Sequence, residues 1–570
     1  MHQPILFDMV CVIIPIYGIL IDFATLQEFI IYIYICYISS QIKLHIIYLI
    51  YNNNMSHEEE EPASPGARLM QAPSFNLCIL AVMGYMTTID LNLFKEEIGR
   101  TLAKHPRFSS LLIVNNKRRG TFSWKRTKVD LEKHVIAPDL DPEMENPDKF
   151  IDDYISGLSK NQMPFEKPLW EVHVLNVRNS DANSTIVFKI DHSIGDGVSL
   201  ISLVLACARK NPDPESLPVV RPKKHKKKTN NGLMIKRLFV LVWTLLTVMF
   251  NTLVDCILFV ATILFLKDTK TPIKAERGVE LSPRRFVRRI ISLEDVKFVK
   301  NAMNVSINDV VLGVTEAGIS RYLNTRYDTD IHPYKKHNEN GAEIMKKSTN
   351  HLPKNLRIRS ACVFNLRPCA KIEDLAEMME KEKLLKGMWG NLVGIVVLPL
   401  TIDLSDDPLT YIRRAKATMD KKKLSLGHKC AFGALKLMLL IFGNEAQARA
   451  RARAHAPVEP IGVRQRHIAA GVSTRVFRNT TLTFSNVVGP QEEINVFGHP
   501  LAYIAPSVFG FPQGLVIHYQ SYVDKLVIAM SADEKLIPNP HQLCDDLVKS
   551  FENIKEAVVK KGIVKGSELC

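Results

Sequence analysis

The chain has 570 residues, of which 46% are hydrophobic and 23% charged. This length allows two to four domains around a large buried core, and the composition excludes a disordered, collagen-like or miniprotein chain. Lys and Arg number 74 against 59 Asp and Glu, a net charge of +15. This modest excess suits an anionic membrane surface or an anionic substrate, and without a nucleic-acid motif we expect no nucleic-acid partner. The ten cysteines form no CxxC pair, which predicts reduced thiols facing the cytosol.

Residues 1–54 differ from the rest of the chain. They are rich in Ile, Tyr and Leu and lack the basic start and cleavage site of a secretory signal. The composition changes abruptly at Met55, so we hypothesise that translation starts there and that 1–54 is a gene-model artefact. The alternative is a membrane anchor around Phe29 to Tyr51. N-terminal sequencing of the native protein separates the two, since peptides from upstream of Met55 contradict the artefact.

Residues 184–210 carry the most informative pattern. Apolar residues alternate up to Asp191 with the period of a strand, which predicts that His192 follows the buried face inward. Gly195 and Gly197 then break the strand, and Asp196 stands where a helix can begin.

An imidazole at a buried strand end can take a proton from a bound hydroxyl, because histidine titrates near neutral pH. Asp196 can hold the turn by accepting backbone N–H groups or by pairing with an arginine. A lone HxxxDG pattern is short, however, and by itself leaves open that His192 is a structural histidine.

A basic cluster at Lys223–Lys228 precedes an apolar run at 238–266. The run is long enough to cross a bilayer, and the lysines suit anionic lipid, so we predict contact with membrane lipid through 223–266. A pair of buried core helices is the alternative. If residues on both sides of the run build one site, a single crossing would separate them. We therefore favour a monotopic segment, an in-plane helix pair or re-entrant hairpin that turns near Asn251 and Asp255.

Six further segments, taken with the HxxxDG turn, resemble one family in order and spacing. They are Pro168-Leu169-Trp170, Asn308-Asp309, Asn365-Leu366-Arg367-Pro368, residues 389–400, Ser485-Asn486 and Gly489-Pro490. The chain resembles the plant wax ester synthase/diacylglycerol acyltransferase family, within the CoA-dependent acyltransferases built like chloramphenicol acetyltransferase. Residues 191–197 match its HHxxxDG motif, except that Asp191 replaces the first histidine and could raise the pKa of His192.

The resemblance implies an α/β, two-domain CoA-dependent acyltransferase fold, with an active-site tunnel at the domain interface and a membrane-associated apolar insert. We expect an N-terminal domain at 55–210, a basic linker with the apolar segment at 211–286, and a C-terminal domain at 287–570. A low-complexity basic insertion at 446–465 is either a retained-intron artefact or, if real, an interruption of the C-terminal domain.

The resemblance also implies the activity, transfer of a long-chain acyl group from acyl-CoA to a long-chain alcohol or diacylglycerol. No metal or cofactor is expected, since acyl-CoA is a substrate. The implied site residues are His192 as general base with Asp196, the supporting Gly197, Asn308 and Asp309, and Ser485 and Asn486 as candidate oxyanion or acceptor contacts.

The expected products are wax esters, with triacylglycerol as a lesser product. The expected location is the endoplasmic reticulum membrane with the active site facing the cytosol, or else the plasma membrane. Two alternatives stay open: a catalytically impaired lipid-binding homologue, and a soluble HxxxDG acyltransferase of specialised metabolism.

Overall fold

The computed structural model describes residues 60–71, 77–115, 121–161, 163–210, 234–331, 350–367, 389–433 and 474–562. By its contacts the chain divides into two units, Met1–Glu61 and Pro62–Cys570, and the fold is that of the second unit. The predictions for 1–54, the basic cluster at 223–228 and the insertion at 446–465 lie outside the described residues.

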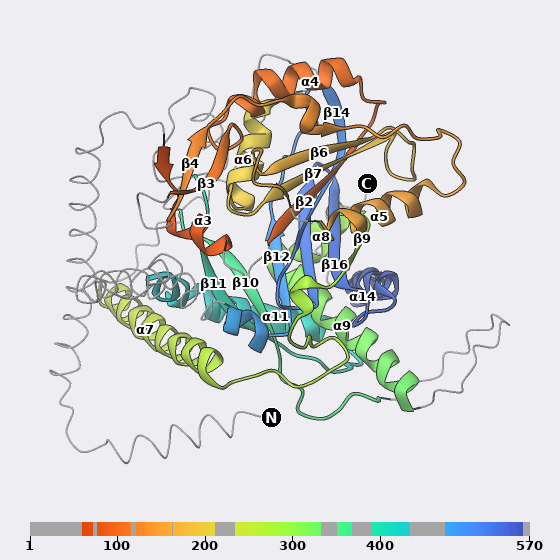
Figure 1. Ribbon diagram of the computed structural model, residues 1–570. Coiled ribbons are helices and arrows are strands. Elements are labelled where there is room, and N and C mark those ends of the chain that lie inside the picture. The colour runs from red at the N-terminus through yellow and green to blue at the C-terminus, as the bar shows by residue number, and fades with distance from the viewer. Residues whose placement is uncertain are drawn as a thin grey trace, which may run out of the picture. The chain divides into compact units, whose positions relative to one another are not determined.

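A seven-stranded sheet, the N-terminal sheet, carries the segment that ends at His192 (Figure 1). Its strands are, in spatial order, β5 (Val135–Ile136), β6 (Trp170–Leu175), β7 (Ser184–Asp191), β2 (Cys78–Tyr85), β14 (His499–Phe509), β13 (Ile494–Val496) and β8 (Ala208–Lys210). β7 is rich in β-branched and aromatic residues and pairs antiparallel with β6 and β2. The predicted strand before His192 is therefore confirmed.

A six-stranded sheet, the C-terminal sheet, forms the other half of the molecule. Its strands are, in spatial order, β11 (Val393–Leu400), β10 (Ile358–Asn365), β12 (Leu482–Val487), β15 (Leu515–Tyr522), β16 (Lys525–Asp533) and β9 (Arg284–Ser292). β12, β15 and β16 are rich in apolar and β-branched residues and lie side by side at the centre of this sheet.

The remaining elements are short strands and the helices. The strands are β1 (Glu60–Pro62), β3 (Ser110–Asn115) and β4 (Thr121–Arg126). The α-helices are α3 (Pro65–Met70), α4 (Leu91–Arg100), α5 (Pro147–Leu158), α6 (Gly197–Cys207), α7 (Met234–Leu264), α8 (Leu293–Ala302), α9 (Ile307–Ile331), α11 (Leu409–Lys423) and α14 (Pro540–Lys560). The 3₁₀ turns are η1 (Leu102–Lys104), η3 (Leu131–Lys133) and η4 (Val279–Leu281).

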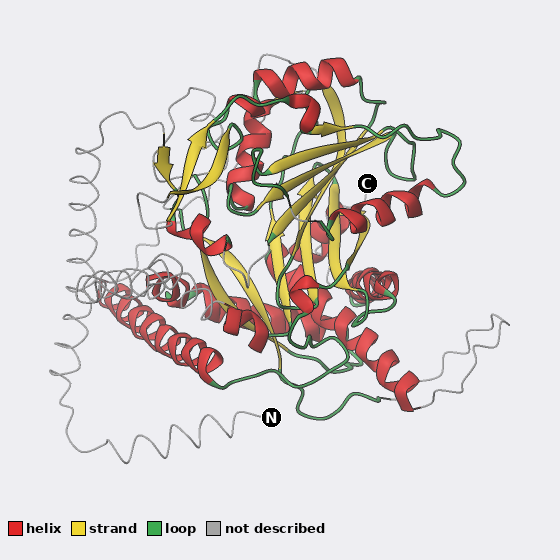
Figure 2. Cartoon of the chain, in the orientation of Figure 1, coloured by secondary structure: helices red, strands yellow, loops and turns green. Residues whose placement is uncertain are grey.

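The two faces of the C-terminal sheet are buried in different ways. Alternate residues such as Ile517 and Ile528 pack with α8, α9, α11 and α14, the helices that cover one face (Figure 2). The residues between them, such as Val516 and Val527, pack against residues of the N-terminal sheet. We call this second face the interface face, because it is where the two halves of the chain meet.

The chain does not divide cleanly between the two sheets. β13 and β14 come late in the sequence, yet β14 pairs with β2 and β13 pairs with β8 in the N-terminal sheet. The boundaries 55–210 and 287–570 stay a prediction, with the qualification that residues 494–509 complete the N-terminal sheet.

The apolar run is one continuous helix, α7, of 31 residues. The predicted turn near Asn251 is therefore wrong, and so is the reading as a pair of buried core helices. Among the described residues, α7 alone is long and apolar enough to cross a membrane, and only 6% of its most apolar window is buried. The side chains of its first turns, from Phe239 to Leu246, are exposed on all sides.

Candidate active site

β7 carries His192 to the end of a strand that is buried on both faces. Ile186 and Phe188 pack into one core and Val187 into another. The His192 backbone N–H donates to Leu77 O at 3.0 Å, which fixes the turn against the chain before β2. The imidazole follows the face of Ile186 and Phe188 and is half-buried.

Asn391 holds the imidazole of His192 from across the domain interface. Nδ1 of His192 lies 3.0 Å from Asn391 Oδ1, and Asn391 Nδ2 donates to the His192 carbonyl oxygen at 2.8 Å. Because the amide nitrogen of Asn391 donates to the His192 carbonyl oxygen, its amide oxygen faces Nδ1 and can only accept a hydrogen bond. Nδ1 therefore carries the hydrogen, and Nε2 presents its lone pair as a base.

Asp196 holds the turn in both of the ways that its position allows. It is the N-cap of α6 and accepts from Ser199 N at 3.0 Å. It also pairs with Arg367, whose two terminal nitrogens lie 2.9 and 3.0 Å from the carboxylate oxygens. The Arg367 side chain is fully buried and that of Asp196 is 3% exposed, so neither charge has access to water.

The same pair fixes both neighbours of Asn391. Arg367 donates to Gly390 O at 2.7 Å, and Leu392 N donates to Asp196 Oδ2 at 3.0 Å. Gly390 has a φ of 109°, a conformation that favours glycine. Asp196 is therefore a positioning residue, since it acts on His192 through the segment that contains Asn391.

The two glycines of the turn differ in their surroundings. A Cβ at Gly195 would lie 3.2 Å from Ser199 Cβ and 3.3 Å from the Trp389 ring, whereas a Cβ at Gly197 would meet no described residue within 4 Å. Gly195 is therefore tightly packed, and the predicted supporting residue, Gly197, is free of such contacts in the described part of the chain.

His518 faces the same site from the interface face of the C-terminal sheet. It pairs with Ser485 on β12 and with Ala529 on β16, and Ala529 packs between the two sheets. Burial, with a further contribution from nearby His192, lowers the pKa of His518 to about 4, so this imidazole is neutral at neutral pH. Its Nδ1 is buried and has no hydrogen-bond partner among the described residues.

The Asn-Asp pair lies at the start of α9. Ser306 N donates to Asp309 Oδ2 at 2.7 Å and Asp309 N donates to Ser306 Oγ at 3.3 Å, a reciprocal cap. Asn308 accepts from Asn486 Nδ2. Strand alternation places Asn486 on the opposite face of β12 from Ser485. Of these two candidate contacts, Ser485 is the one on the interface face.

Trp170 and Asp191 make packing contacts and hydrogen bonds with other protein groups. The Trp170 ring is fully buried, stacks on His134 at 4.1 Å and donates from Nε1 to Phe108 O at 2.9 Å. The Asp191 carboxylate accepts from Gln71 Nε2 at 2.8 Å and from Ser193 N at 2.8 Å. Burial raises the pKa of Asp191, and the bonds from Ser193 and Gln71 oppose that rise.

Two family models match this chain. The wax ester synthase/diacylglycerol acyltransferase catalytic domain matches residues 70–311, and the WS/DGAT C-terminal domain matches residues 389–555. The chain belongs to the wax ester synthase/diacylglycerol acyltransferase family. The predicted family and the predicted acyltransferase class are thereby confirmed.

Relatives and a solved structure agree with this membership. The chain is 47% identical over 511 residues to wax ester synthase/diacylglycerol acyltransferase 11 of Arabidopsis thaliana, covering 89% of this chain and 96% of the relative. It is 40% identical over 519 residues to number 6 of the same plant, covering 88% and 95%. The wax ester synthase/diacylglycerol acyltransferase from Marinobacter aquaeolei VT8 shares its fold, with a TM-score of 0.51, 15% identity and coverage of 88% and 100%.

In this family member, sequence reasoning missed Asn391 and His518 as site residues. Asn391 lies in the segment 389–400 that resembles the family. Arg367, the arginine that pairs with Asp196, lies in the segment Asn365-Leu366-Arg367-Pro368. Neither pairing can be predicted without the fold. His518 lies in an apolar strand sequence, LVIHYQSY. A polar, titratable residue at a buried strand position was the available signal.

Proposed function

We propose that this protein transfers a long-chain acyl group from acyl-CoA to the hydroxyl of a long-chain alcohol, and less readily to diacylglycerol. The observation that carries the proposal is the orientation of His192: Asn391 occupies Nδ1 and leaves Nε2 as the proton acceptor. Family membership supplies the class of reaction.

The chemistry is a single displacement. His192 Nε2 removes the hydroxyl proton as the acceptor oxygen attacks the thioester carbonyl, which gives a tetrahedral oxyanion. The oxyanion then collapses, the C–S bond breaks, and the imidazolium returns its proton to the CoA thiolate. General-base catalysis of this kind contributes about 10²- to 10⁴-fold, and alignment of the two substrates contributes much of the rest.

Ser485 is the proposed oxyanion contact. Its hydroxyl is on the interface face, in register with His518, and a hydroxyl donor at a developing oxyanion stabilises the transition state more than the ground state. Asn486 is not proposed in this role, because it donates to Asn308.

Substrates of this kind partition into bilayers, and α7 offers a surface for them. Its exposed residues include Phe239, Trp243, Phe250, Leu253, Ile257, Val260 and Leu264. A long helix with an apolar outer face suits an in-plane position at the lipid interface, with aromatic residues near the headgroups. We propose that the protein lies on the cytosolic leaflet of the endoplasmic reticulum.

Liposomes that contain anionic lipid and hexadecanol test this function in one experiment. We expect the purified protein to float with the liposomes and to form palmityl palmitate from palmitoyl-CoA, with one free CoA for each ester. Liposomes with dioleoylglycerol in place of hexadecanol are expected to give triacylglycerol more slowly. Flotation without ester from either acceptor would favour the impaired lipid-binding homologue, and ester formation without flotation would contradict the membrane position.

A further inference from the structure

One face of α7 attaches the helix to the C-terminal half. We call this face the inner stripe, and it carries both polar and apolar residues. Asn251 Nδ2 donates to the carbonyl oxygen of Leu424 at 3.1 Å, and the Asp255 carboxylate accepts from Lys422 and from Ser425 Oγ at 2.5 and 2.6 Å. Val254 and Leu258 alternate with these polar residues at helical spacing. The residues that suggested a turn therefore bind α7 to the end of α11 and the loop after it.

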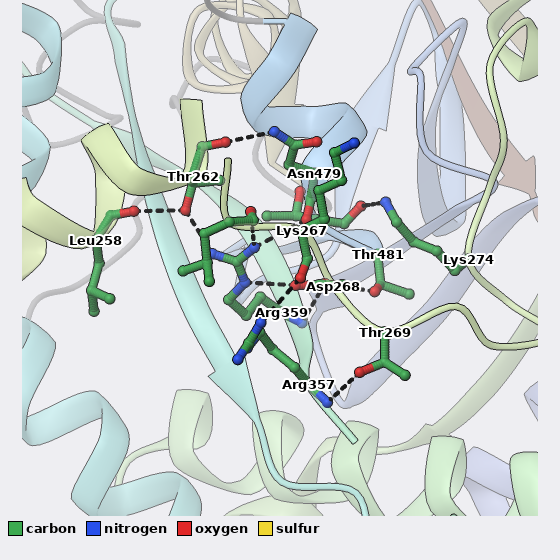
Figure 3. Close-up of polar contacts among 12 residues, drawn as sticks. Leu258, Thr262, Lys267, Asp268, Thr269, Lys274, Arg357, Arg359, Asn479 and Thr481 are labelled. Atoms are coloured by element: carbon green, nitrogen blue, oxygen red, sulfur yellow. Dashed lines mark hydrogen bonds and ion pairs between the residues drawn. The ribbon is translucent and has the colours of Figure 1, made fainter. Parts of the chain in front are cut away.

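A second set of bonds fixes the C-terminal end of α7 (Figure 3). Arg359 on β10 donates to Thr262 Oγ1 at 2.6 Å and pairs with Asp268 at 2.6 Å. Asn479 Nδ2 donates to Thr262 O at 2.6 Å, and Thr481 Oγ1 donates to Asp268 Oδ2 at 2.6 Å. The Asp268 side chain is fully buried. With both ends of the stripe anchored, α7 keeps a fixed position over the edge of the C-terminal sheet.

Between α7, β11 and α11 lies a partly open cavity of about 240 Å³. Its apolar lining includes Val254, Leu258, Phe259, Ile395, Val397 and Pro399. An apolar cavity of roughly 150 Å³ is already large enough to bind benzene. Two of the charged lining residues, Asp255 and Lys422, are paired with each other, so the cavity suits an uncharged aliphatic chain.

One row of side chains links this cavity to the catalytic histidine. Ile395 pairs with Val363 on β10, and Ser485 pairs with His518 on β15. Cys362 on β10 pairs with Phe484 on β12, so the next residues, Val363 and Ser485, are also neighbours. The row therefore crosses β11, β10, β12 and β15 in register. At about 4.8 Å between strands, its ends are roughly 14 Å apart.

This row lies on the interface face of the C-terminal sheet, the face that is turned toward His192. Ala361, two residues before Val363, packs with the N-terminal half, and Ile395 packs against the same core. At the other end, His518 is near enough to His192 for the histidine charge to affect it. Val363 is 37% exposed, so the middle of the row is partly open.

We propose that the cavity under α7 binds the far end of a substrate's aliphatic chain, with its reactive end at His192. This proposal rests on the proposed function and adds the place of the chain. α7 then has two roles: its inner stripe forms the wall of the chain pocket, and its outer face contacts the bilayer from which the chain comes. The pocket fixes the chain length that the enzyme prefers.

Two matched substitutions test the pocket. Val254→Phe places a larger side chain in the cavity under α7, and Val559→Phe makes the same change on the surface of α14, where Val559 is 57% exposed. We expect Val254→Phe to lower kcat/KM for the longest chains at least about tenfold and to leave octyl chains unchanged. Val559→Phe is expected to keep the wild-type profile. Val397→Phe on β11 serves as a second cavity variant if Val254→Phe does not fold.

Two substrate series identify the chain that occupies the pocket. Acyl-CoAs from octanoyl to stearoyl are tested with hexadecanol, and alcohols from octanol to octadecanol with palmitoyl-CoA. If the preferred chain length shifts in only one series, the chain varied in that series is the one that occupies the pocket. A wild-type profile in both cavity variants, or an equal loss at every chain length, would overturn the proposal.

A binding measurement separates the pocket from the reaction. Hexadecanol and palmitoyl-CoA with a terminal diazirine are photo-crosslinked to the wild-type protein, and the labelled peptides are mapped. Labels on the cavity-lining Val254 or Leu258 of α7, or on β11, support the pocket even if no ester forms, in which case only the proposed function fails. Labels confined to other segments overturn the pocket while leaving the reaction intact.

Discussion

Replacing His192 with alanine is expected to lower kcat/KM for wax ester formation by about 10²- to 10⁴-fold, because the proton acceptor is lost. The imidazole is half-buried, and in the described part of the chain its side chain forms a hydrogen bond with Asn391. The variant should therefore fold. The measurement is the initial rate of ester formation at several palmitoyl-CoA concentrations, with the thermal midpoint recorded for both proteins.

Asn391→Asp is the matched control for this prediction. Aspartate keeps an acceptor for the Nδ1–H of His192 and adds a negative charge that favours the imidazolium, but it lacks the Nδ2 donor to the His192 carbonyl oxygen. We expect it to retain part of the activity and to move the acid limb of the kcat/KM profile to higher pH. Equal activity in the wild type and His192→Ala would remove His192 from the mechanism.

Asp196→Ala is expected to lower the free energy of unfolding by about 3–5 kcal/mol, because it removes the carboxylate that forms the bidentate pair with the buried Arg367. The loss also frees Gly390 and Leu392, which flank Asn391. Activity should therefore fall together with stability. Urea denaturation and the ester assay, both at low temperature, measure the two effects.

Two further variants distinguish positioning from chemistry. In the double variant Asp196→Asn/Arg367→Met neither charge remains, and we expect it to recover part of the stability and activity lost in Asp196→Ala. Arg413→Met removes one partner of the exposed pair with Asp407 and should cost less than about 1 kcal/mol. Loss of activity at full stability in Asp196→Ala would instead mean that Asp196 contacts substrate.

Local patterns predicted the strand and helix that flank the turn from His192 to Asp196. The alternation up to Asp191 and the capping residue Asp196 are short-range signals, and β7 and α6 begin and end close to where these signals place them. The Asn391 contact with His192 joins residues 199 positions apart. Such a pairing depends on how two sheets meet, which no local pattern encodes.

The turn predicted at Asn251 fails for a related reason. In an apolar helix, two polar residues four positions apart suggest a break if the helix is considered alone. In the fold they lie on one face of α7, where Leu424 O, Lys422 and Ser425 supply their partners. Tertiary hydrogen bonds thus satisfy groups that would otherwise require a turn.

Likewise, nothing in the sequence of β14 indicates that it completes the N-terminal sheet.

The central claim is that His192 activates the acceptor for direct attack on the thioester. Intact-mass measurement of the protein incubated with palmitoyl-CoA, first without and then with hexadecanol, tests it most directly. The account predicts an unmodified protein mass and no CoA release until hexadecanol is added. A palmitoylated protein with a burst of CoA in the absence of alcohol would contradict it.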